Sequence, residues 1–246
     1  MKRLEKDNVI NSVHPLMFWN KNLYKNEYNP LEYHVGGRGT CFLYKTNKYY
    51  YLITAKHNLD ANNTEGIVKE MSSCHIFSNY ENTFKQTSFS HFNKNNTLKL
   101  RYIPINFTEK DAYYSDLCIF HIFDNFPDDK SCLYSIFPDF TVEDKGYMIG
   151  YPNYLKSNTN NIIEYQKAIV ELEISGSDLN NILMAYSHGI DIKKLNGFSG
   201  SPLVQYSSSK DKYILFGMVI MGNSNIVKII PTIIIDSVIS EYEKRY

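Results

Sequence analysis

The sequence has no apolar run long enough to cross a membrane and no excess of charge of either sign. Its longest apolar stretch, residues 226–239, is interrupted by Lys228, Pro231 and Asp236, whereas a membrane-spanning helix needs about 20 apolar residues. The 26 basic and 26 acidic side chains cancel, so no field of one sign attracts nucleic acid or an anionic membrane. We therefore expect neither a membrane nor nucleic acid among its partners.

The sequence also lacks the features of a secreted or metal-binding protein. Its first residues are basic, but the polar residues 5–8 replace the apolar segment of a signal peptide. The four cysteines form neither a C-x-x-C motif nor the framework of a small disulfide-rich domain. They are Cys41, Cys74, Cys118 and Cys132. We predict free thiols, no metal, no cofactor and a cytoplasmic location.

Glycine and proline are modest in number, whereas the chain contains 21 Tyr and 14 Phe. From residue 39 onward, apolar and aromatic runs of about five to eight residues alternate with turns rich in Asn, Ser and Lys, which is typical of strands. Helical spacing is persuasive over residues 231–246, and residues 3–13 could form a short helix. The length suits one large domain or two packed half-domains, and many short strands predict an all-β barrel or sandwich pair.

The most informative run is Asn196-Gly197-Phe198-Ser199-Gly200-Ser201-Pro202-Leu203-Val204. A serine between glycines suits a nucleophile turn, because glycine permits the tight backbone and the amides of Gly197 and Ser199 can point at a developing oxyanion. A plain Gly-Ser turn before a strand fits the same letters. An α/β-hydrolase is excluded, because its histidine follows the serine and no histidine follows Ser199 here.

A base and an acid must then precede the serine. His57 ends an apolar run, Tyr50-Tyr51-Leu52-Ile53-Thr54-Ala55-Lys56-His57, so a strand could hold it in register. Asp116 opens another apolar run, Leu117-Cys118-Ile119-Phe120, where it could orient the imidazole. Taken singly, His57 could be a surface residue, and Asp116 could mark a turn. Asp111 and Asp124 are rival acids, but neither opens such a strand.

Together these runs resemble trypsin-like serine peptidases. Gly39-Thr40-Cys41-Phe42 with Leu52-Ile53-Thr54-Ala55-Lys56-His57 is similar to the family's G-[ST]-G-F and V-[LV]-T-A-A-H segments. Ser115-Asp116-Leu117-Cys118-Ile119 is similar to D-[IL]-A-L-[IL]. Gly197-Phe198-Ser199-Gly200-Ser201-Pro202 is similar to G-[DN]-S-G-[GS]-P, and Gly217–Gly222 is similar to G-I-V-S-W-G, which pairs with substrate backbone. These segments cover roughly a fifth of the chain and keep the family's His, Asp, Ser order.

The resemblance implies two six-stranded β-barrels, with the site in the cleft between them. The expected boundaries are an N-terminal extension over residues 1–34, a first barrel over 35–125, a second barrel over 126–230 and a C-terminal helix over 231–246. His57, Asp116 and Ser199 would form a catalytic triad, with the amides of Gly197 and Ser199 as the oxyanion hole. Lys193, Ile220, Met221 and Gly222 would line the substrate site.

Some residues depart from the family pattern, and they bear on how activity is controlled, on the cellular compartment and on substrate preference. Phe198 replaces the acid that pairs with a newly cut N-terminus in digestive relatives, so activation by that route is not expected. Cys41 stands at a usual glycine, and Asn58 stands where secreted relatives carry a disulfide cysteine. A lysine at 193 could favour acidic substrates or point to solvent, whereas Ile220 and Met221 favour an apolar pocket wall.

Two functions are compatible with these residues. The first is a serine endopeptidase that acts on protein or peptide substrates through an acyl-enzyme, with a possible activating partner protein and a possible place in bacterial stress or phage defence. The second is a silent or latent trypsin-like domain that binds peptides or a partner protein. Retention of all three triad residues favours the peptidase.

Overall fold

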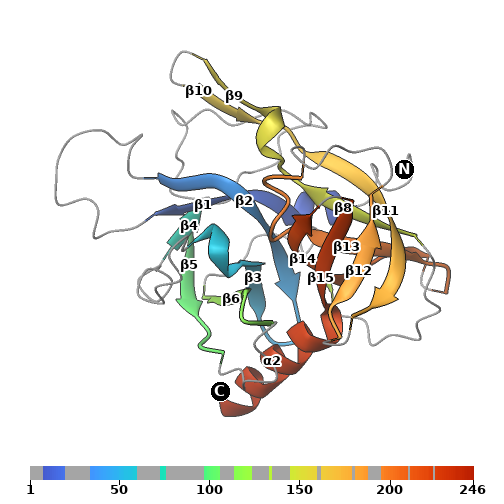
Figure 1. The fold of residues 1–246 in the computed structure, drawn as a ribbon. Coiled ribbons are helices and arrows are strands. Elements are labelled where there is room, and N and C mark those ends of the chain that lie inside the picture. Colours follow the sequence, from blue (N-terminus) through green and yellow to red (C-terminus); the bar gives the residue numbers. More distant parts are fainter. Residues whose placement is uncertain are drawn as a thin grey trace, which may run out of the picture.

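The structure is a computed structural model that describes twelve segments of the chain. These are residues 8–19, 34–59, 73–75, 97–105, 114–123, 133–134, 145–159, 162–178, 181–187, 195–209, 211–223 and 225–246. The described part is mostly β-structure in two halves that lie side by side, with one helix across their lower side (Figure 1).

The first half is a seven-stranded sheet in the order β1-β4-β5-β6-β3-β2-β7, in which β1 also pairs with β2. Every pairing is antiparallel except that of β2 with β7. Its strands are β1 (Val13–Trp19), β2 (His34–Lys45), β3 (Tyr50–Ala55), β4 (Ser73–His75), β5 (Thr97–Tyr102), β6 (Leu117–Ile122) and β7 (Leu133–Tyr134).

The second half contains a closed barrel of six strands in the order β11-β12-β15-β14-β13-β8. They are β8 (Lys145–Gly150), β11 (Ala168–Ser177), β12 (Leu183–Tyr186), β13 (Pro202–Ser207), β14 (Lys212–Asn223) and β15 (Ile226–Pro231). A separate hairpin joins β9 (Lys156–Thr159) to β10 (Ile162–Tyr165). The predicted all-β class and one six-stranded barrel are therefore confirmed. The second six-stranded barrel stays a prediction, since the first half is a sheet of seven strands in which β1 pairs with both β4 and β2.

The N-terminal part of the chain differs from the expected helix over residues 3–13. A 3-10 turn, η2 (Asn8–Ser12), is followed at once by β1, and residues 1–7 lie outside the described part. The predicted extension 1–34 thus contains a strand of the first sheet. This strand is hard to predict from the sequence, because Pro15 lacks the backbone amide that donates hydrogen bonds within a sheet. The register of β1 against β2 shifts between Pro15 and Met17.

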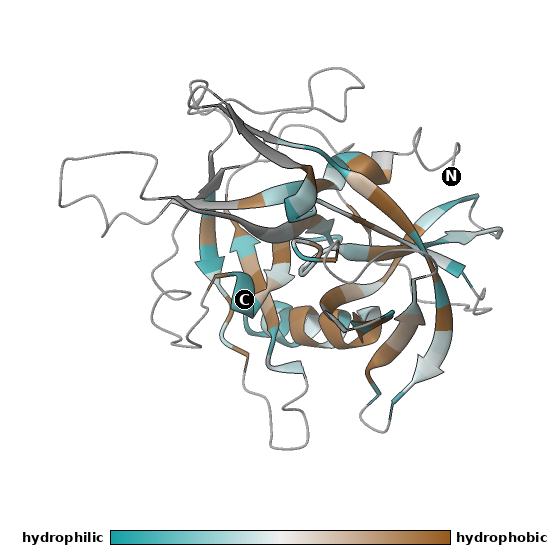
Figure 2. Cartoon of the chain, turned by 45° about the horizontal axis from the view of Figure 1, so that its top comes forward, coloured by the Kyte–Doolittle hydropathy of each residue, from teal (hydrophilic) through white to brown (hydrophobic). Residues whose placement is uncertain are grey.

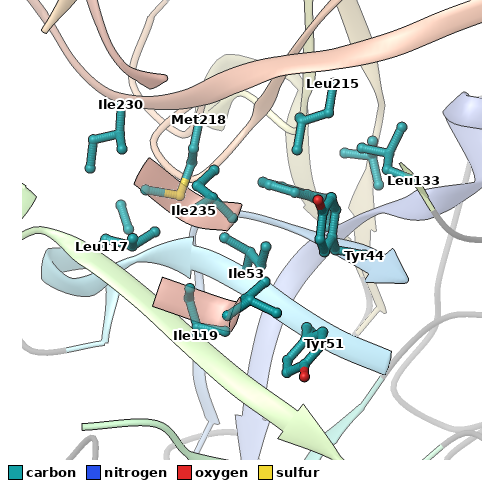
Figure 3. Close-up of a cluster of buried hydrophobic side chains, with 14 of the residues drawn as sticks. Tyr44, Tyr51, Ile53, Leu117, Ile119, Leu133, Leu215, Met218, Ile230 and Ile235 are labelled. Atoms are coloured by element: carbon teal, nitrogen blue, oxygen red, sulfur yellow. The ribbon is translucent and has the colours of Figure 1, made fainter. Parts of the chain in front are cut away.

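The two halves share one core. Strands β3 and β6 are buried along almost their whole length because their side chains are apolar on both faces. Residues of the first half, including Ile53 and Leu117, form one cluster with Met218 and Ile230 of the barrel (Figure 3). Burial of such side chains stabilises a fold by about 1.5–3 kcal/mol each, so separation of the halves would expose apolar surface.

The predicted C-terminal helix is present as α2 (Thr232–Arg245). It begins directly after Pro231 and buries Ile235, Ile239 and Tyr242, which recur at helical spacing. The helix also carries hydrophilic residues along its length (Figure 2). Within the described ranges, no helix is both long and apolar enough to cross a membrane.

Polar contacts fix α2 of the second half to β3, β6 and the turn after β2 in the first half. Glu243 Oε1 accepts hydrogen bonds from Tyr51 Oη at 2.8 Å and from Thr46 Oγ1 at 2.5 Å. His121 Nδ1 and Tyr242 Oη are 2.9 Å apart. The helix therefore holds the two halves together both through these bonds and through the shared core, to which its Ile235 and Ile239 belong.

Lys167, just before β11, joins the N-terminal turn to the second half. Its side chain is buried, its ammonium lies 5.4 Å from the centre of the Tyr151 ring, and Nζ donates to the carbonyl of Ile10. Burial lowers the pKa of Lys167 to about 7 and that of the nearby His14 to about 3, with the charge of Lys167 as a smaller cause. The cause is the cost of removing a charge from water.

We predict that stability rises with pH because of Lys167. The unfolded lysine titrates near 10.5 and the folded one near 7, so above pH 7 the unfolded state binds more protons and the free energy of unfolding increases, by about 2 kcal/mol from pH 7 to pH 9. Urea unfolding of the wild type and of Lys167→Met at both pH values measures this. The variant should lack this rise, and equal slopes in the two proteins would contradict the assignment.

Candidate active site

Antiparallel pairing of β3 with β6 brings His57 and Asp116 together. Ala55, the last residue of β3, lies opposite Leu117, the first residue of β6. His57 follows that end of β3 in the short turn η4 (Lys56–Asn58), and Asp116 directly precedes β6. Two residues 59 positions apart in the chain therefore meet at one edge of the sheet.

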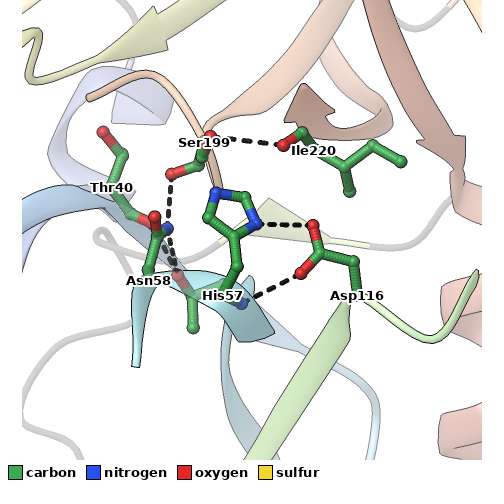
Figure 4. A network of polar contacts seen from close by, with 7 residues as sticks. Thr40, His57, Asn58, Asp116, Ser199 and Ile220 are labelled. Atoms are coloured by element: carbon green, nitrogen blue, oxygen red, sulfur yellow. Dashed lines mark hydrogen bonds and ion pairs between the residues drawn. The ribbon is translucent and has the colours of Figure 1, made fainter. Parts of the chain in front are cut away.

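The Asp116 carboxylate holds His57 at two points. Oδ1 accepts a hydrogen bond from the backbone amide of His57 at 2.9 Å, and Oδ2 lies 2.7 Å from Nδ1 of its ring (Figure 4). The Asp116 carbonyl also accepts from the Lys56 amide at 2.6 Å. Because a carboxylate accepts, this contact places a proton on Nδ1, and in the neutral ring Nε2 is then the acceptor.

Solvent reaches the two side chains unequally. The His57 side chain is 48% exposed and that of Asp116 is 25% exposed. The imidazole is therefore open to a molecule that approaches from solvent, while the carboxylate behind it is largely covered. This is the order of exposure that a base and its orienting group require.

Ser199 lies in the turn that leads into β13, and hydrogen bonds to β14 fix this turn. The Gly200 amide donates to the Val219 carbonyl at 2.7 Å, and the Val219 amide donates to the Ser201 carbonyl at 2.8 Å. Gly200 has φ +83°, and a Cβ there would lie 2.1 Å from the Thr40 carbonyl oxygen. Glycine is required at this position for both backbone conformation and space.

The first half of the protein holds the Ser199 backbone. The Ser199 carbonyl accepts hydrogen bonds from the Thr40 amide at 2.9 Å and from Asn58 Nδ2 at 2.8 Å. Thr40 lies on β2, and Asn58 is adjacent to His57. Figure 4 shows the His57 ring between Ser199 and Asp116, so the three predicted residues lie at one place.

The Ser199 hydroxyl, however, donates to the Ile220 carbonyl on β14 at 3.2 Å. No hydrogen bond joins it to His57 Nε2 in this arrangement of described residues. The 3.2 Å distance is long for an O–H···O bond. Hydrogen bonds between a nucleophile and its base are often loose without substrate.

Two amides near Ser199 have no backbone partner among the described residues. Those of Phe198, Gly200 and Ser201 donate to carbonyls, whereas those of Gly197 and Ser199 do not. The carbonyl before Gly197, that of Asn196, accepts from the Asn153 amide at 2.8 Å. Since the carbonyl and amide of one peptide point in opposite directions, the Gly197 amide points away from Asn153. Two amides are thus available to an anion.

Phe198 fills the apolar interior beneath the turn. Its side chain is 1% exposed and belongs to a cluster with Met148, Leu203 and Val219. A Cβ on Gly150 would lie 2.8 Å from the ring, so the packing is close. The turn before Ser199 is therefore held by burial of an aromatic ring, where an acid would have needed a cationic partner.

The remaining predicted site residues are described to different extents. Ile220 is buried on β14, and Gly222 faces Leu195, because a Cβ on Gly222 would lie 2.9 Å from Leu195 Cδ1. The backbone of Met221 continues β14, but its side chain is outside the described part, as is all of Lys193. Beyond Met218, β14 pairs with β15 and no longer with β13. One edge of β14 beside Ser199 is therefore unpaired with β13.

Sequence reasoning missed the roles of Thr40 and Asn58. Thr40 appeared within a strand motif and Asn58 as a replacement for cysteine, yet both bind the Ser199 carbonyl. A polar residue directly after a strand-end histidine could have suggested Asn58. Cys41 and Cys118 are buried and form no disulfide within the described ranges, and burial raises the pKa of Cys118. In the described ranges, no group of three His, Cys, Asp or Glu side chains converges in a way that could hold a metal.

Comparison with known proteins supports the fold. No protein-family model matches the chain, and no curated protein matches its sequence. Among solved structures, it is similar to the serine endoprotease from Yersinia pestis, with a TM-score of 0.56 and 14% sequence identity. The match covers 98% of this chain and 66% of that one. The chain thus shares the fold of that structure and spans just under two thirds of its length.

We predict that Gly197→Ala destabilises the protein more than Gly176→Ala. Gly197 has φ +99°, and a Cβ there would lie 2.6 Å from the Tyr151 carbonyl oxygen and 2.7 Å from the Asn153 nitrogen. Gly176 has φ +121°, but nothing lies within 4 Å of its Cβ position. Both variants carry backbone strain of about 1–3 kcal/mol, and Gly197→Ala adds the collision. Urea unfolding measures the difference; equal losses would contradict the close packing at Gly197.

Proposed function

We propose that this chain is a serine endopeptidase, with Ser199 as nucleophile, His57 as general base and Asp116 as the group that orients the base. The observation that carries the proposal is the meeting of three segments: the turn after β3, the residue before β6 and the turn before β13. The 2.7 Å contact between Asp116 and His57 leaves Nε2 of the neutral ring as an acceptor, and the ring lies beside Ser199 (Figure 4). Two unpartnered amides lie next to that serine.

The reaction then follows from these positions. Rotation of the Ser199 hydroxyl away from the Ile220 carbonyl frees its oxygen to attack a peptide carbonyl while His57 Nε2 takes the proton. The amides of Gly197 and Ser199 stabilise the oxyanion that forms. His57 returns the proton to the leaving amine as the C–N bond breaks. Water, activated by the same nitrogen, then hydrolyses the acyl-enzyme.

The substrate binds as an extended strand along β14. The edge at Ile220, Met221 and Gly222 has no β13 neighbour, so it can pair with a peptide backbone by strand addition. The side chain before the cleaved bond then points towards Gly222, Leu195 and Val227, of which Leu195 and Val227 are buried. Such a wall favours a small apolar residue over a charged one.

A second candidate function is peptide binding without turnover. It is favoured by the hydrogen bond of Ser199 to the Ile220 carbonyl, which directs the hydroxyl away from His57. The retained contact between His57 and Asp116 and the free amides argue for the peptidase, because a binding module needs neither. Labelling with a fluorophosphonate separates the two, since it requires an activated serine.

We predict that Ser199→Ala abolishes both fluorophosphonate labelling and cleavage of a peptide library. The substitution removes the nucleophile, while the turn stays folded because it is held through backbone atoms and Phe198. The matched control is Ser201→Ala in the same turn, whose buried hydroxyl has no hydrogen-bond partner among the described residues, and it should keep labelling. Wild-type cleavage by Ser199→Ala would show that another group is the nucleophile.

We predict that Asp116→Asn lowers kcat by about 10⁴ while the thermal unfolding midpoint changes little. The amide can still accept one hydrogen bond, but it favours the wrong tautomer of His57. Asp111→Asn, the rival acid in the sequence, serves as the control and should retain activity. A similar loss in Asp111→Asn with a harmless Asp116→Asn would transfer the orienting role to Asp111.

A further inference from the structure

Thr40 joins the two segments that surround the Gly197 amide. Its side chain is fully buried on β2, where Thr40 pairs with Pro15 of β1. Its hydroxyl donates to the Gly197 carbonyl at 2.9 Å and accepts from the Tyr151 amide at 2.9 Å. One hydroxyl therefore satisfies a carbonyl of the nucleophile turn and an amide of the segment after β8.

These contacts fix both peptide planes at Gly197. The plane before it carries the Gly197 amide, and its Asn196 carbonyl is held by the Asn153 amide at 2.8 Å. The plane after it carries the Gly197 carbonyl that Thr40 holds. Asn153 is only two residues beyond Tyr151, so the same hydroxyl that holds the Gly197 carbonyl also anchors the segment that holds the Asn196 carbonyl.

We propose that Thr40 is a positioning residue for the oxyanion hole: its hydroxyl sets the direction of the Gly197 amide. This inference rests on the proposed peptidase function. A hydroxyl is needed because the position requires one donor and one acceptor in the same small space. The space is closed, since a Cβ on Gly150 would lie 2.9 Å from Thr40 Oγ1.

A valine at position 40 would keep the shape and remove both bonds. The Gly197 carbonyl and the Tyr151 amide would then be left without partners, which is costly when such groups lie away from water. Rotation of the peptide planes at Gly197 would relieve this, because glycine permits many backbone conformations. That rotation would turn the Gly197 amide away from the oxyanion. The loss would fall on the transition state rather than on the bound substrate.

The experiment compares Thr40→Val, Thr40→Ser and a control, Thr232→Val. Thr232 is also a buried threonine whose hydroxyl donates to a backbone carbonyl, that of Leu215 at 3.0 Å, but it lies at the start of α2. For each protein, kcat and KM for a peptide, affinity for a peptide boronic acid that mimics the tetrahedral intermediate, and the thermal midpoint are measured.

We expect Thr40→Val to lower kcat and boronate affinity by about 10- to 100-fold, somewhat less than loss of an oxyanion donor itself, with KM changed less than about threefold. Thr40→Ser should restore most of the kcat, because it restores the hydroxyl. Thr232→Val should lower the thermal midpoint without lowering kcat. Should Thr40→Val not fold, Thr40→Ala is measured against Thr40→Ser with the same expected difference.

Unchanged kcat in a folded Thr40→Val or Thr40→Ala would overturn the positioning role, as would a loss that Thr40→Ser shares in full. An equal loss of kcat in Thr232→Val would overturn it too, because the effect would then follow stability. Failure of the proposed function looks different. In that case the wild type itself neither labels with a fluorophosphonate nor cleaves peptide, and the boronate does not bind.

Discussion

The arrangement at Ser199 depends on two hydrogen bonds that its carbonyl accepts from the other half of the protein. One comes from the Thr40 amide and the other from the Asn58 side chain, which is adjacent to His57. A serine and a histidine on separate halves can act together only if the distance between the halves is fixed. The shared apolar core supplies the strength of this junction, while the directional bonds supply its geometry. Asn58 connects the two residues most directly.

The interior beneath the nucleophile turn is held by apolar packing. Phe198 is buried among aliphatic side chains of the barrel, so the turn does not need a charged partner that arrives from elsewhere in the chain. Hydrogen bonds from Thr40 and Asn153 then orient the individual peptides around Gly197. Packing thus sets where the turn lies, and polar contacts set which way its amides point. The two tasks fall on different residues, so they can be altered separately.

Alternation of apolar strands and polar turns was enough to predict the β class and the C-terminal helix, because burial determines both patterns. The proximity of His57 and Asp116 could also be predicted from the sequence, because His57 ends one apolar run and Asp116 opens another. Strand β1 could not be predicted, because Pro15 within it argues against a strand. Closure of a sheet could not be predicted either, because it depends on pairings between residues that are distant in the sequence. The role of Thr40 was hidden for the same reason: its hydroxyl bonds to Gly197, 157 positions away.

The wide separation of these residues along the chain has a consequence for biosynthesis. His57 and Asp116 emerge from the ribosome first and can meet as soon as β3 pairs with β6. The bond from Asn58 to Ser199 spans 141 positions, and the Ile220 carbonyl comes later still. A partly synthesised chain therefore holds a histidine and a carboxylate without their serine. Because domains fold in order as they are made, the three residues can come together only after the segment that carries Ser199 has been synthesised.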